Sequence, residues 1–69
     1  MNNEMKTALR HEFQKMTPQE KASTLSRAEG WMERHGGEQQ ASSEMEFHRA
    51  ATKATISLLR QAGAHYRLG

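Results

Sequence analysis

The stretch Thr17–Glu20, with the sequence TPQE, marks a boundary between two helices in the first third of the chain. A threonine with a glutamate three residues later forms a capping box, in which each side chain binds the backbone N–H of the other residue. Pro18 suits the first helical position, because its missing N–H needs no partner there. Proline also disfavours helix in the preceding residues, so an earlier helix should end near Met16. We interpret the stretch as a helix start and not as an active site.

The spacing of apolar residues predicts a helix on each side of this boundary. The first should cover residues 4–16 with Asn3 as its N-cap, and its apolar stripe faces either the core or a partner. The second should cover residues 18–35 and stop at Gly36–Gly37, since glycine commonly follows a helix end. The stripe of the first helix consists of Met5, Leu9, Phe13 and Met16.

A third helix is predicted over residues 43–62. Ser43 begins the sequence SEME, which has the spacing of a second capping box. The preceding residues are also good helix formers, so a start at residue 38 is an alternative that the sequence leaves open. Gly63 should follow the helix as its C′ residue, within a flexible tail over residues 63–69.

The residue types of the chain favour an all-α fold. Valine is absent and isoleucine occurs once, whereas strong helix formers such as alanine, leucine, methionine and glutamate are abundant. Two helices of similar length joined by a glycine pair predict an antiparallel hairpin, to which the first helix is added within one domain of residues 1–69. A chain of 69 residues without cysteine has a marginal core and no disulfide to support it. We therefore expect a homodimeric helical bundle.

The predicted third helix carries an apolar arc about twice as wide as a single intramolecular contact needs. One side of the helical wheel gathers Phe47 and Leu58 with several alanines. The neighbouring flank holds Met45, Ile56 and Leu59. Either the first helix covers this flank or another molecule does, and we favour contact with a second subunit or a target protein.

A short basic stripe lies on the opposite side of the same helix, formed by Arg49, Lys53 and Arg60. Such a stripe suits a solvated face, an acidic protein surface or, least well, nucleic acid, because it is short and has no aromatic side chains on which bases stack. Aromatic and arginine side chains supply many of the strongest contacts in protein interfaces. The candidate partner-binding residues are Trp31, Met32, Phe47, Arg49, Lys53, Ile56, Leu59, Arg60 and Tyr66.

We expect no catalytic, cofactor or metal site. His11 and Glu12 begin a pattern found in zinc proteases, but Lys15 stands where the second histidine is required. No nucleophile elbow, Walker loop or glycine-rich dinucleotide turn occurs. No apolar run approaches the ~20 residues that cross a bilayer, and we expect no signal peptide because the first residues have no apolar central region. The predicted location is the cytoplasm.

The chain resembles the small phage-encoded inhibitors of host regulators, such as the quorum-sensing anti-activators of Pseudomonas phages. The features that carry the resemblance are the length, the boxes TPQE and SEME, and the pair Gly36–Gly37. It implies a dimeric helical hairpin in the host cytoplasm that binds a transcription activator and keeps it from DNA. Because it rests on no specific motif, it assigns no role to single residues. A small DNA-associated regulator and a structural assembly subunit are the alternative functions.

Overall fold

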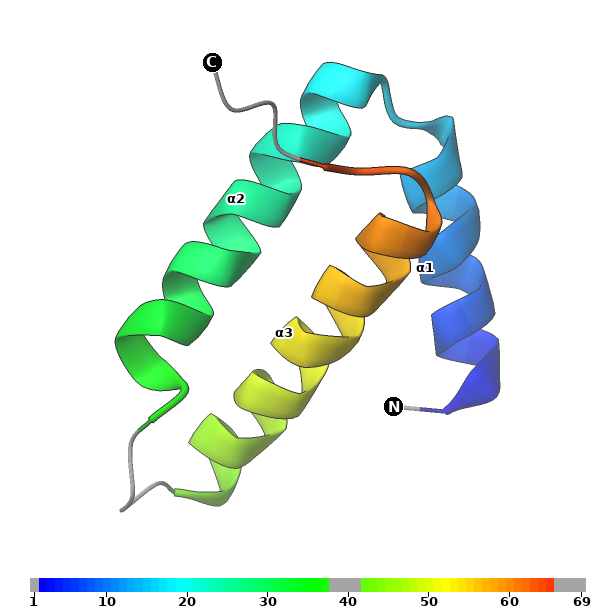
Figure 1. The fold of residues 1–69 in the computed structure, drawn as a ribbon. Helices are drawn as coiled ribbons and strands as arrows, with labels where there is room; N and C mark the ends of the chain where they lie inside the picture. The colour runs from blue at the N-terminus through cyan, green and yellow to red at the C-terminus, as the bar shows by residue number, and fades with distance from the viewer. Residues whose placement is uncertain (1, 38–41, 66–69) are drawn as a thin grey trace.

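Three α-helices make up the regular secondary structure in the computed structural model, which describes residues 2–37 and 42–65. They are α1 (Asn3–Lys15), α2 (Pro18–His35) and α3 (Ser43–Gln61). The predicted all-α fold is confirmed, and the three helices lie close to their predicted bounds. In Figure 1, α3 lies in the middle, with α2 on one side and α1 on the other.

α1 begins one residue earlier than predicted because its N-cap is Asn2 and not Asn3. The side-chain oxygen of Asn2 accepts a hydrogen bond from the backbone N–H of Met5 at 2.8 Å. Asn2 has the extended backbone typical of an N-cap, and Asn3 is the first helical residue. The two adjacent asparagines are equally good caps by residue type, so the sequence alone did not distinguish them.

The predicted capping box at the start of α2 is confirmed. Thr17 Oγ1 accepts a hydrogen bond from the Glu20 N–H at 3.1 Å, and Glu20 Oε1 accepts one from the Thr17 N–H at 2.9 Å. Met16 closes the preceding helix, since its N–H donates to the carbonyl of Phe13. The chain reverses at this point, so that α2 runs in the opposite direction to α1 (Figure 1).

α3 begins at Ser43, the later of the two predicted starts. The prediction that Ser43 is also the N-cap was wrong. The N-cap is Ser42, whose Oγ accepts a hydrogen bond from the Met45 N–H at 3.1 Å. Ser43 is already helical, so the sequence SEME does not form a capping box. An earlier start is excluded because Ser42 has an extended backbone, and residues 38–41 lie outside the described part of the chain.

Gly63 ends α3, as predicted, by adopting a left-handed backbone with φ of 94°. Its N–H donates to the carbonyl of Arg60 at 3.1 Å, and the Ala64 N–H donates to the carbonyl of Leu59 at 2.9 Å. These two bonds form a Schellman motif. The motif turns the chain back onto the helix end, where Ala64 is only 5% exposed.

Replacing Gly63 by alanine should lower the free energy of unfolding by about 1–2 kcal/mol, because residues with a Cβ are strained in a left-handed backbone. The added methyl group itself meets nothing within 4 Å. Thermal unfolding should show a fall in Tm of about 4–8 °C for each kcal/mol lost. Gly37→Ala is the matched control, since its Cβ also has open space and its φ is not left-handed. Equal losses in the two variants would contradict this explanation.

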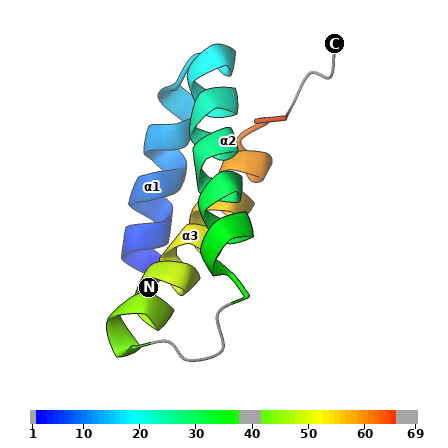
Figure 2. The ribbon, with the colours of Figure 1, turned by 90° about the vertical axis from the view of Figure 1, so that its left-hand side faces the viewer.

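The helices form a nearly flat layer and not a closed bundle. The Cα positions span 36 × 34 × 13 Å, and their radius of gyration is 12.7 Å. A compact chain of this length has a radius of gyration of about 11 Å. α1 and α2 each pack against α3 and make little contact with each other. Figure 1 shows α1 and α2 on opposite sides of α3, with α1 and α3 diverging toward their N-terminal ends. In the view of Figure 2, α3 crosses the direction of the other two helices obliquely.

The core lies near the C-terminal end of α3, where all three helices meet. Leu59 has no exposed surface and Leu25 is 1% exposed. The other buried apolar residues of the core are Phe13, Leu58 and Ala64.

This core corrects one prediction. Leu59 was expected to contact a partner, but α1 and α2 flank α3 on two sides and enclose it within the single chain. Leu58 in the wide apolar arc is buried in the same way, whereas Met45 and Ile56 remain half-buried and Phe47 is exposed.

Candidate functional site

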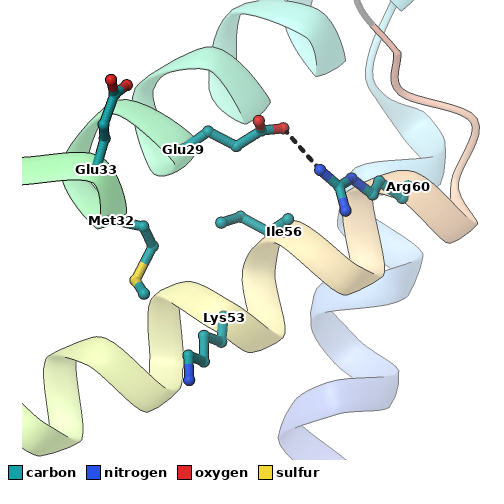
Figure 3. A pocket seen from close by; sticks show the side chains of 6 residues that line it. All are labelled: Glu29, Met32, Glu33, Lys53, Ile56 and Arg60. Atoms are coloured by element: carbon teal, nitrogen blue, oxygen red, sulfur yellow. Dashed lines mark hydrogen bonds and ion pairs between the residues drawn. The ribbon is translucent and has the colours of Figure 1, made fainter. Parts of the chain in front are cut away.

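A shallow groove runs between α2 and α3, and Figure 3 shows the side chains that line it. Met32 from α2 and Ile56 from α3 occupy the space between the two helices, and both are half-buried. Two carboxylates flank them on the α2 side and two cations on the α3 side. The residues of this α2–α3 groove are Glu29, Met32, Glu33, Lys53, Ile56 and Arg60.

One ion pair crosses the α2–α3 groove. Arg60 Nη2 donates a hydrogen bond to Glu29 Oε1 at 3.3 Å, and the two side chains are 62% and 29% exposed. A pair this exposed contributes less than about 1 kcal/mol to folding. Glu33 and Lys53 point away from the groove on opposite sides in Figure 3. All four charged groups therefore remain accessible to another molecule.

A second groove lies between α1 and α3, and it is basic. Lys6 and Arg10 come from α1 and Lys53 from α3, while no carboxylate is among the residues that line it. The Nε of Arg10 is buried without a hydrogen-bond partner among the described residues. The remaining residues of this α1–α3 groove are Ala54, Ser57, Leu58 and Gln61.

Within residues 2–37 and 42–65, two large apolar side chains are exposed, and each belongs to a stripe that is otherwise covered. Phe47 is 67% exposed and Met5 is 51% exposed. Phe47 shares its helical face with Leu58, which faces the α1–α3 groove. Met5 shares its face with Phe13, which lies in the core. Met5 lies near the N-terminal end of α1 and Phe47 near that of α3. These two ends diverge in Figure 1.

Trp31 packs between α2 and α3 near the end of the hairpin where the two helices are connected. Its ring stacks on that of His48 with centroids 4.3 Å apart and an interplanar angle of 19°. It also lies against His35, with centroids 4.9 Å apart and the rings tilted by 42°. Aromatic pairs of this kind stabilise a fold by about 0.5–1.5 kcal/mol beyond simple burial. Trp31 is half-buried, so the structure favours a packing role over a contact with a partner.

The structure brings together four of the nine predicted partner-binding residues, in the α2–α3 groove: Met32, Lys53, Ile56 and Arg60. Phe47 is exposed elsewhere on α3, whereas Arg49 is half-buried. Tyr66 lies outside the described residues.

Sequence reasoning missed the acidic side of this groove, Glu29 and Glu33. The signal was present, because carboxylates four residues apart share one helix face and these two flank Met32. It also missed Lys6 and Arg10, since only the packing of α1 beside α3 places them near Lys53.

Within residues 2–37 and 42–65, no three histidine or carboxylate side chains come together in a way that would hold a metal ion. None of the helices described is both long enough and apolar enough to span a bilayer. Comparison of the chain with protein-family models, with curated proteins and with solved structures finds no match.

Proposed function

We propose that this chain is a small homodimeric interaction protein that acts by covering the surface of a regulatory protein. It works by stoichiometric binding in the cytoplasm and not by catalysis. The observation that carries the proposal is the exposure of Phe47, at 67%, on a helix whose other large apolar residues are buried or half-buried. An exposed aromatic side chain of this kind is typical of an interface anchor.

The chemistry around Phe47 defines the surface of the partner. Met5, on α1, is a second exposed apolar side chain, and the α1–α3 groove, on the same face of α3 as Phe47, supplies the cations Lys6, Arg10 and Lys53. A complementary surface therefore has an apolar centre with acidic groups around it. Charges at the edge of such an interface mainly set the rate of encounter and the choice of partner, while the apolar anchor supplies most of the affinity.

The resemblance to phage-encoded inhibitors of host regulators supports one form of this function. In that form, the partner is a transcription activator, and the bound chain keeps the activator from engaging DNA. Covering a surface needs only a rigid scaffold and accessible anchors, both of which a three-helix layer of 69 residues supplies. A dry cleft of the size that small-molecule catalysis uses is not required.

Capture from a bacterial lysate tests the proposal. The tagged chain should retain one cellular protein in an amount comparable to its own, and that protein should be a regulator of transcription. In a gel-shift assay, adding the chain should dissociate the complex between the captured activator and its DNA, and this result would demonstrate masking. Recovery of the chain alone would contradict the proposal and favour a structural assembly subunit.

A DNA-associated regulator is the second candidate, and the lack of a carboxylate in the α1–α3 groove favours it. Its three cations would release counterions from three phosphates, which gives a slope of log affinity against log salt of about −2.7 for duplex DNA. Binding of duplex DNA of random sequence at low salt, with an affinity that falls with this slope as salt rises, would support a function in DNA binding. Absence of retention at low salt would remove it.

A further inference from the structure

The two sides of the α2–α3 groove carry opposite charges. Glu29 and Glu33 lie on α2, and Lys53 and Arg60 lie on α3, with Met32 and Ile56 between them (Figure 3). We infer that a second copy of this chain docks face to face on this groove, about a two-fold axis parallel to α3. The inference rests on the homodimer of the proposed function and specifies which surface forms it.

The direction of the axis follows from the charges. A two-fold axis that runs along the groove exchanges its two sides, so the acidic side of each copy faces the basic side of the other. Glu29 and Glu33 then lie opposite Lys53 and Arg60 of the second copy, and the reverse contact repeats by symmetry. A two-fold axis across the groove would instead place carboxylates against carboxylates. The α3 helices of the two copies are therefore parallel in the dimer.

The apolar part of the groove lies on or near this axis. Met32 and Ile56 are half-buried in the single chain, and each would meet the same pair from the second copy. Four such side chains form a small apolar centre, and the charged residues form a rim around it. An apolar centre with a polar rim is the usual arrangement of protein interfaces.

The chain exposes 5320 Å². A compact monomer of 7.9 kDa exposes about 4400 Å². The flat layer therefore exposes more surface than a compact chain, and a second copy on the α2–α3 groove would cover part of it. Phe47 and Met5 are not among the residues that line the α2–α3 groove, whereas Lys53 lines both grooves.

Charge reversal on one side of the groove tests the inference. The variant with Glu29→Lys and Glu33→Lys has two basic sides, and the variant with Lys53→Glu and Arg60→Glu has two acidic sides. In sedimentation experiments that all use the same micromolar protein concentration, the unchanged protein should have the mass of two chains. Each variant should have the mass of one chain. An equimolar mixture of the two variants should regain the mass of two chains. A single-chain mass for the unchanged protein, or two-chain masses for the separate variants, would overturn the inference.

A cysteine placed near the axis gives a second test, because the natural chain contains no cysteine. Residues near a two-fold axis meet their own copies, and a disulfide needs Cα atoms within about 7 Å. Ile56→Cys should form disulfide-linked dimers on mild oxidation. Ser23→Cys, an exposed position on α2 that lines neither groove, should not. Equal cross-linking of the two variants would contradict the proposed face.

The same variants separate this inference from the proposed function. The Glu29→Lys and Glu33→Lys variant leaves Phe47 and the α1–α3 groove unchanged, and circular dichroism checks its helix content. If the unchanged protein captures a regulator but has the mass of one chain, the homodimer and its face are overturned, and the function in masking a partner stands. If it dimerises as described and captures nothing, only the function in masking a partner is overturned.

Discussion

Replacing Leu59 by alanine should remove about half of the stability of this protein. Leu59 has no exposed surface and lies where α1, α2 and α3 meet. Truncating a buried leucine removes its burial and leaves a cavity, which together cost about 2–5 kcal/mol. A domain of 69 residues has a total stability of only about 3–10 kcal/mol. The midpoint of thermal unfolding should therefore fall by at least about 8 °C, or the chain should be largely unfolded at 25 °C.

Phe47→Ala is the matched control, since it removes a large apolar side chain from the same helix. Phe47 is 67% exposed, so its truncation should change the free energy of unfolding by less than about 0.5 kcal/mol. Both variants are compared at one protein concentration, because the unfolding midpoint of a chain that dimerises depends on its concentration. Similar losses of stability in the two variants would contradict the description of the core.

The same Phe47→Ala variant should lose its regulatory partner while keeping its fold. An aromatic anchor at the centre of an interface contributes about 2 kcal/mol or more, so the dissociation constant should rise at least about 30-fold. Titration of the captured regulator into the two proteins by calorimetry measures this change. The helix content should stay the same, because Phe47 lies outside the buried core.

Arg27→Ala provides the control for binding. Arg27 is exposed on α2 and lines neither the α2–α3 groove nor the α1–α3 groove. Its removal should leave the dissociation constant unchanged within about twofold. Unchanged binding in Phe47→Ala, or an equal loss in Arg27→Ala, would show that the regulator does not use the exposed aromatic side chain.

The helices were predictable because their ends are encoded locally. Thr17, Pro18 and Glu20 fix the start of α2 by contacts within four residues, and Gly63 fixes the end of α3. The errors are of the same local kind. Asn2 and Ser42 each cap a helix one residue before the predicted cap. In both places the same residue type occurs twice in a row, so residue type alone does not identify the cap.

The candidate site was less predictable because it depends on how the helices pack. A helical wheel shows that Leu59 and Ile56 share a flank of α3, but not that α1 and α2 enclose the first and leave the second half-buried. Lys53 and Arg60 were recognised on α3, whereas their relation to Glu29 and Glu33 requires the pairing of α2 with α3. Contacts between elements distant in sequence decide which side chains gather at a surface.

The molecular mass of the protein in solution tests most directly whether two copies of the chain associate and bury surface between them. Static light scattering at micromolar concentration should give twice the chain mass of 7.9 kDa. The mass should fall toward one chain as salt is raised, because the charges of the α2–α3 groove are exposed and screened. A mass of one chain at low salt would contradict the account.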